Sequence, residues 1–161
     1  MPLGTPARRM PIPEDIRDFL SDLLGKPVAV SKGQKLSFDD PTRFVTGVYI
    51  EDDGTLGGAC IADLSLAASA GAALAMMPTV VAKESVDAGE LSEGLRDNFY
   101  EVANILSRLL NGPSVPHLRI SELAAGVPDQ VMELSGKAAG LKHYDVTIVD
   151  YAGGSMSLLA A

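Results

Sequence analysis

Cysteine and histidine are almost absent from this chain of 161 residues, which has one cysteine, Cys60, and two histidines, His117 and His143. A single cysteine cannot form a disulfide within the chain. The two histidines are not at the spacing of metal ligands on a helix, and the cysteine is far from both in sequence. We therefore expect no metal site and no cofactor of the chain's own.

Positive charge is also scarce, because 13 Lys and Arg stand against 21 Asp and Glu, for a formal net charge of −8. No stretch contains the cluster of Lys or Arg that binding to a nucleic-acid phosphate backbone requires, which excludes a nucleic-acid partner. No apolar run follows Arg8 and Arg9 that could serve as the core of a signal peptide. The expected location is the cytoplasm.

Long uncharged stretches are limited to residues 64–82, which approach the length of a membrane span. Seven of these nineteen residues are Ala, two are Ser, and Gly71 and Pro78 interrupt the stretch. No basic cluster flanks it. The pattern is typical of a buried alanine-rich helix, and we expect no interaction with a membrane.

The composition, with 47% apolar and 21% charged residues, indicates a folded globular chain, and the length fits one domain. Residues 1–12 contain three of the ten prolines and little apolar pattern. They are predicted to form a flexible N-terminal tail, followed by a single domain over residues 13–161.

Helical patterns come first in the domain. Residues 13–24 place apolar side chains on one helical face, and Gly25 provides a stop. Asp63 can cap the alanine-rich helix, which Pro78 is expected to end. A long helix is predicted from about Glu90 to Leu110, with Asp87 and Glu90 favouring its positive N-terminal end.

Alternating apolar residues predict the strands, and turn residues predict two hairpins, around 51–55 and around 152–154. Residues 128–137 fit either a short helix or a loop. The order of elements predicts an α+β fold with helices packed on a mostly antiparallel sheet. The expected strands are 28–30, 44–50, 56–62, 117–123, 144–150 and 155–159.

The predicted long helix is strongly amphipathic. Seven apolar residues fall on one face about 100° wide, at about 100° per residue, and that face must be buried. The polar residues form a stripe nearly opposite, so burial of the first stripe presents the second to solvent. The polar stripe contains Glu90, Glu93, Asp97, Glu101, Asn104, Arg108 and Asn111.

Glu101 and Asn104 are three residues apart, so their side chains are neighbours on this exposed ridge and can reach one external cleft together. A charged outer face is also what an ordinary amphipathic helix has, so geometry alone leaves both a functional and a purely solvent-facing interpretation open.

The segment resembles the signature of the CheC, CheX and FliY family, phosphatases of chemotaxis and two-component signalling that act on a phosphorylated response regulator. Asp97, Glu101 and Asn104 stand at the family's spacing, and Pro128 follows one residue later than the family's proline, with Pro113 and Pro116 as other prolines in that stretch. The resemblance covers most of residues 13–160 and implies a CheC-like fold.

Some members of the family carry the motif twice, whereas residues 13–24 here contain no Glu-x-x-Asn. The comparison therefore implies one active face, as in CheX. It also implies that the substrate is the aspartyl phosphate of a CheY-like receiver domain, which would supply Mg²⁺. The implied catalytic residues are Glu101 and Asn104, supported by Asp97 and Pro128.

In this family, the Glu and Asn enter the acidic pocket of the receiver. Carried over, Asn104 would orient the attacking water and Glu101 would pair with the receiver's lysine, so this hydrolase needs no nucleophile of its own. An acidic helix face is repelled by an acidic pocket at long range, so docking must depend on that lysine, the bound cation and local contacts.

Two other classes of function stay open at this point. One is a non-catalytic module that binds receivers or serves as a flagellar-switch adaptor, and the other is a small-ligand or structural domain. The sequence also leaves open whether the chain forms a homodimer.

Overall fold

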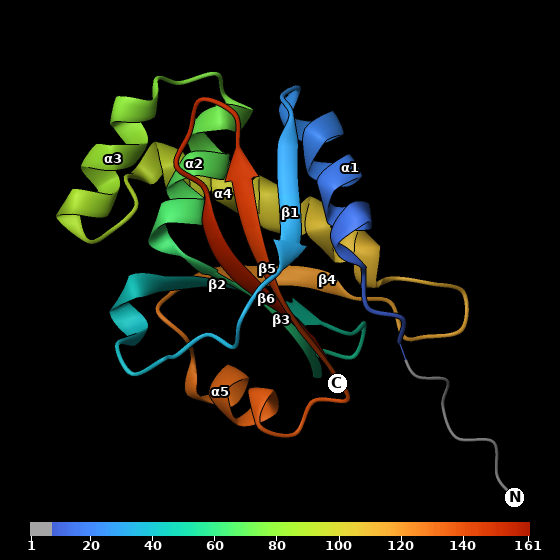
Figure 1. Cartoon of the computed structure of the whole chain (residues 1–161). Coiled ribbons are helices and arrows are strands. Elements are labelled where there is room, and N and C mark those ends of the chain that lie inside the picture. Colours follow the sequence, from blue (N-terminus) through green and yellow to red (C-terminus); the bar gives the residue numbers. More distant parts are fainter. Residues whose placement is uncertain (1–7) are drawn as a thin grey trace, which may run out of the picture.

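The computed structural model describes residues 8–161 and contains an antiparallel sheet of six strands in the order β1-β5-β6-β3-β2-β4 (Figure 1). Helices pack on both faces of this sheet, which confirms the expected α+β fold. The helices are α1 (Pro13–Leu24), α2 (Leu64–Leu74), α3 (Thr79–Ala88), α4 (Glu93–Leu106) and α5 (Asp129–Ser135), with short 3-10 helices η1 (Pro41–Arg43) and η2 (Ser107–Leu110). The strands are β1 (Val28–Lys32), β2 (Phe44–Ile50), β3 (Leu56–Asp63), β4 (Arg119–Ala125), β5 (Gly140–Ile148) and β6 (Gly154–Ala160).

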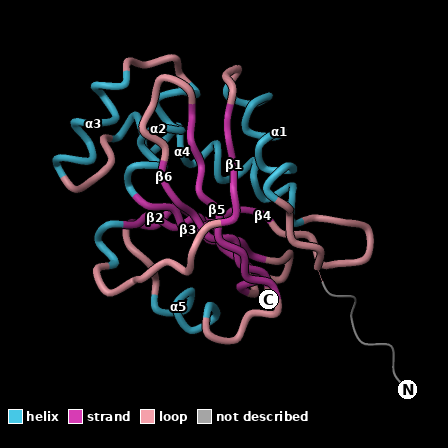
Figure 2. The backbone as a smooth tube through the Cα atoms, in the orientation of Figure 1, coloured by secondary structure: helices cyan, strands magenta, loops and turns pink. Residues whose placement is uncertain are grey.

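Both predicted hairpins are present. β2 pairs with β3 in antiparallel register, and β5 pairs with β6 in the same way. The two edge strands are joined to the sheet by long-range pairing, since β1 pairs with β5 and β4 pairs with β2. Figure 2 shows these strands crossing the middle of the molecule, with the helices around them.

The first helix runs from Pro13 to Leu24, and Gly25, with a positive φ of 65°, caps its last turn, as predicted. Of the predicted flexible tail over residues 1–12, residues 1–7 lie outside the described part of the chain, and residues 8–12 contact the domain. Arg8 donates to the carbonyl oxygen of Leu110 at 2.6 Å. The carbonyl oxygen of Pro11 accepts the buried hydroxyl of Tyr144 at 2.6 Å. These contacts attach the segment to the domain, because buried donors need acceptors.

The alanine-rich segment forms α2 and is almost wholly buried, as expected. Asp63 caps it, since its carboxylate accepts the backbone N–H of Leu66 at 2.8 Å. The predicted end at Pro78 is wrong: the helix ends at Leu74, and Met76 takes a left-handed φ of 56°. Pro78 instead precedes the first turn of α3, a helix the sequence did not predict.

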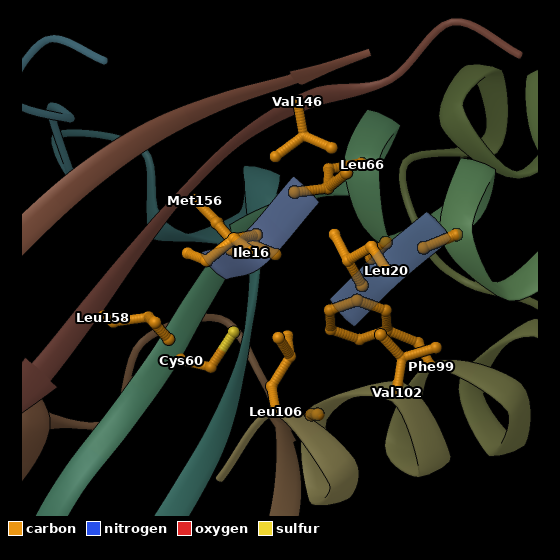
Figure 3. Packing of buried hydrophobic residues seen from close by; sticks show 14 of the residues in the cluster. Ile16, Leu20, Cys60, Leu66, Phe99, Val102, Leu106, Val146, Met156 and Leu158 are labelled. Atoms are coloured by element: carbon orange, nitrogen blue, oxygen red, sulfur yellow. The ribbon is translucent and has the colours of Figure 1, made fainter. Parts of the chain in front are cut away.

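The main core lies between one face of the sheet and helices α1, α2 and α4 (Figure 3). Phe99, Val102 and Leu106 of α4 point into this core, toward Ile16 and Leu20 of α1. The alternation of each strand sends the intervening side chains to the other face, where α5 packs in a second cluster. Figure 1 shows α5 on the side of the sheet opposite to α1, α2 and α4.

Over residues 8–161, no helix is both long enough and apolar enough to cross a bilayer. The segment 64–82 is divided between α2 and the start of α3, and most of α2 is packed in the core.

Candidate functional site

The predicted long helix is real but shorter at both ends. α4 begins at Glu93 because Ser92 caps it, with its hydroxyl accepting the N–H of Leu95 at 3.4 Å. Asp87 lies in α3 and Glu90 precedes the cap, so neither occupies the first turn of α4. At the other end the chain tightens into η2 from Ser107 onward.

One side of α4 is fixed against α2. The side-chain amide of Asn98 donates to the carbonyl oxygen of Gly71 at 3.0 Å. Gly71 also permits close approach, because a Cβ at this position would lie 2.9 Å from the carbonyl oxygen of Leu95. The two helices therefore touch backbone to backbone, which explains why α2 is built from small residues.

The other side of α4 is fixed against the sheet. The buried hydroxyl of Tyr49 in β2 donates to the carbonyl oxygen of Ala103 at 2.6 Å. Burial raises the pKa of Tyr49 well above its ordinary value, so the phenol keeps its proton. Gly47 leaves room for the Ala103 methyl group, and Arg96 donates to the carbonyl oxygen of Leu123 in β4 at 2.6 Å.

These contacts leave the part of the predicted polar stripe that lies within α4 on the outer face of the helix. Asn111, the last member of that stripe, lies beyond η2 and its side-chain amide is hydrogen-bonded to the backbone of Leu118. Asp97 and Glu101 are exposed, and Asn104 is half-buried. Within residues 8–161, no hydrogen bond or ion pair engages these three side chains. Glu101 and Asn104 are about 60° apart around the helix axis and about 4.5 Å apart along it, so both can reach one external group.

Pro128 is not brought to this stripe. It immediately precedes α5, and the adjacent Val127 belongs to the cluster on the opposite face of the sheet. The other prolines after the motif lie in the loop between η2 and β4, where Pro113 is exposed. The structure thus joins Asp97, Glu101 and Asn104 on one helix face and places Pro128 elsewhere.

Tyr100 was missed by the sequence reasoning, which assigned it to neither stripe of the helix. Its side chain is 37% exposed. It lies on the β4 side of the exposed face, one turn after Arg96, whereas Glu101 lies on the side toward Asn98 and α2. A helical wheel of the segment would have placed Tyr100 at the margin of the polar stripe.

The other chemically reactive side chains are separate from this face. Cys60 is buried in β3, and burial raises its pKa to about 12, which keeps the thiol protonated. His143 contacts the hydroxyl of Ser157 at 2.6 Å, and burial lowers its pKa. Residues 8–161 contain no group of three or more His, Cys, Asp or Glu that could hold a metal ion.

No family model and no curated protein matches the sequence. Solved structures do match the fold. The FliM middle domain from Vibrio alginolyticus has a TM-score of 0.58 at 10% identity and covers 91% of this chain and 86% of its own. FliY from Thermotoga maritima has a TM-score of 0.52 at 12% identity, with 90% and 81% covered.

CheX from the CheX–CheY–BeF3–Mg²⁺ complex of Borrelia burgdorferi has a TM-score of 0.51 at 16% identity, with 89% of this chain and 90% of that chain covered. At these identities the likeness establishes a shared fold. The chain therefore has the CheC/FliM-like fold that the resemblance of its motif implied.

Chemically, Glu101 and Asn104 offer a carboxylate beside an amide on the outer face of α4. An amide can donate to and accept from a water molecule at the same time. A carboxylate can pair with a cation on a partner. Because α4 is held at Gly71, Tyr49 and Leu123, the backbone that carries these two groups is fixed in position.

Proposed function

We propose that this protein is a phosphatase that hydrolyses the aspartyl phosphate of a chemotaxis-type response regulator receiver domain. The observation that carries the proposal is the position of exposed Glu101 and half-buried Asn104 on the outer face of α4, at the family's spacing and with neither side chain bonded to another among residues 8–161. The fold shared with CheX and FliY is consistent with it.

Asn104 has the central role in this proposal. Phosphoryl transfer passes through a loose transition state, so catalysis rests on placing the attacking water and stabilising charge. The Asn104 amide would hold that water in line with the phosphorus–oxygen bond that breaks. Holding a reactant in position can lower a barrier by several kcal/mol, which suits an acyl phosphate that already hydrolyses unaided.

Glu101 would pair with the receiver's active-site lysine and so fix the orientation of the two proteins. The receiver supplies the phosphorylated aspartate and its divalent cation, and the present chain supplies no nucleophile. Asp97 lies one turn before Glu101 and extends the acidic surface toward the N-terminal end of α4.

The test is phosphate release from phosphorylated chemotaxis-type receiver domains of the same organism. The wild-type protein should accelerate release from a cognate receiver, and Asn104→Ala should abolish the acceleration with the fold intact. Gln130→Ala is the matched control, since it removes an exposed amide from α5 on the opposite side of the sheet. An Asn104→Ala variant as active as this control would remove Asn104 from the mechanism.

Glu101→Ala should act mainly on docking. We expect a raised KM for the phosphorylated receiver and a smaller effect on kcat. Glu84→Ala removes an exposed carboxylate from α3 and serves as the control for the change in net charge. Unaltered affinity in Glu101→Ala would contradict the proposed pairing with lysine.

A second candidate is a non-catalytic adaptor that binds a receiver or another switch protein. It is favoured by the likeness to the FliM middle domain, which is among the more similar structures. The same assay separates the two functions. Binding of a phosphorylated receiver without any change in the rate of phosphate release would select the adaptor.

A further inference from the structure

The aromatic side chains of this protein are buried or packed against a hydrophobic cluster, with one exception on the face that carries Glu101 and Asn104. The hydroxyls of Tyr49, Tyr144 and Tyr151 each donate to a backbone carbonyl oxygen. Tyr100 has no such partner among residues 8–161 and belongs to no hydrophobic cluster there. The four phenylalanines all belong to, or pack against, a hydrophobic cluster: Phe19, Phe38, Phe44 and Phe99.

The position of Tyr100 follows from contacts on both flanks of α4. Arg96, one turn earlier, reaches the carbonyl oxygen of Leu123 in β4, and Asn98 reaches Gly71 in α2. Tyr100 therefore lies on the β4 flank of the exposed face and Glu101 on the α2 flank, with Asn104 between them in angle and one turn beyond Tyr100. A partner that covers Glu101 and Asn104 must also meet Tyr100.

Charge alone cannot provide the affinity for such a partner. The chain has a net charge of −8, and Glu93, Asp97 and Glu101 give this face three carboxylates. The phosphorylated pocket of a receiver is also negative, so the two proteins repel each other at long range. Short-range burial of apolar surface has to compensate, and interfaces obtain it preferentially from Tyr, Trp and Arg.

We infer that Tyr100 is the aromatic contact through which this face binds its receiver domain, placing Asn104 over the phosphoryl group. The inference rests on the proposed function for the identity of the partner. Tyr100 is a positioning residue: its ring becomes buried against the receiver, and it takes no part in the chemical step.

The experiment measures the affinity of the protein for chemotaxis-type receiver domains loaded with beryllofluoride and Mg²⁺, so that binding is read without turnover. Tyr100→Ala should weaken binding about 10- to 100-fold, the range of an interface aromatic. Tyr100→Phe keeps the ring and should stay within about threefold of wild type. Met132→Ala, at the same exposed fraction of 37% but on α5, should leave the affinity unchanged.

Steady-state phosphate release provides the second reading. Tyr100→Ala should raise KM and leave kcat at saturating receiver unchanged. If Tyr100 had only a structural role, the same substitution would instead lower the stability of the folded protein. Thermal unfolding should therefore be the same for Tyr100→Ala and wild type. Unaltered affinity in Tyr100→Ala, or a loss in Tyr100→Phe as large as that in Tyr100→Ala, would overturn the aromatic contact.

The two proposals fail in different ways. If Asn104→Ala abolishes catalysis while Tyr100→Ala binds normally, the phosphatase stands and the aromatic contact is wrong. If no receiver loses phosphate faster but Tyr100→Ala weakens beryllofluoride-dependent binding, the contact stands and the function is that of an adaptor. Failure of the wild-type protein to bind any chemotaxis-type receiver domain of the same organism overturns both.

Discussion

The hydroxyl of Tyr49 in the sheet donates to the carbonyl oxygen of Ala103, the residue directly before Asn104. This bond ties the motif helix to β2 at the point where the candidate catalytic amide leaves the helix. It lies inside the main core, and burial raises the pKa of the phenol well above its ordinary value, so the hydroxyl stays a hydrogen-bond donor.

Tyr49→Phe should destabilise the protein by about 1 kcal/mol, the net value of a buried hydrogen bond. A larger loss is not expected, because the carbonyl oxygen of Ala103 also accepts the N–H of Ser107. Urea unfolding measures the change. Tyr100→Phe is the control, since its hydroxyl has no partner among residues 8–161, and it should stay within about 0.5 kcal/mol of wild type. Equal stability of the two variants would contradict the bond.

Replacing Gly71 or Gly94 with alanine should change the stability of the protein in opposite directions. Gly71→Ala places a methyl group 2.9 Å from the carbonyl oxygen of Leu95, so the helices must move apart, at a cost of about 1–3 kcal/mol. Gly94→Ala meets nothing within 4 Å and gains helix propensity, which should stabilise the protein by about 0.5 kcal/mol. Urea unfolding of both variants measures the signs, and a neutral Gly71→Ala would disprove the close contact.

Much of the fold was predictable because its signals are local. Asp63 caps α2 and Gly25 ends α1 through contacts within a few residues, and alternation marked the strands of both hairpins. Helix α3 was not predicted, because the signals around it are ambiguous. A proline is found both after the end of one helix and before the start of the next, so Pro78 alone could not show where α2 ends. The chain turns after α2 at Met76, which has a left-handed φ although it is not glycine, so the sequence contains no signal for this turn.

The candidate site was predictable to a similar extent. Helical periodicity alone placed Glu101 and Asn104 on the outer face, because the apolar stripe of α4 is wide and continuous. The place of Pro128 depends on which face of the sheet α5 covers, and only the packing of Val127 against the second cluster decides that. The exposure of Tyr100 depends on how Arg96 and Asn98 fix the rotation of the helix.

The contribution of Asp63 to the stability of the fold should decrease as the pH rises, because its pKa is raised in the folded state. Its carboxylate accepts the N–H groups of Leu66 and Ser155, yet burial raises its pKa. The folded state then binds the Asp63 proton more tightly than the unfolded state, whose pKa is about 3.9. The contribution of Asp63 is therefore greatest below about pH 4 and declines as the pH rises through the raised folded value.

Asp63→Asn isolates this effect, since asparagine also caps a helix but does not titrate. The difference in unfolding free energy, wild type minus variant, should fall as the pH rises from about 4 into the neutral range, because ionisation of the buried carboxylate destabilises only the wild type. Urea unfolding across this range provides the measurement. A difference that increases with pH would mean that the two N–H donors outweigh burial and lower the pKa.

One receiver should bind per chain, because α1 lacks the features of the α4 face. The exposed surface of α1 carries the carboxylates Glu14, Asp18 and Asp22 and no amide, and the one aromatic residue of this helix, Phe19, packs against the main core. Titration calorimetry with a beryllofluoride-loaded receiver should give a stoichiometry of one. Asn104→Ala should keep this stoichiometry, since the amide acts on the attacking water, whereas Tyr100→Ala should weaken the single transition. A second transition that survives in Tyr100→Ala would reveal a receiver site away from α4.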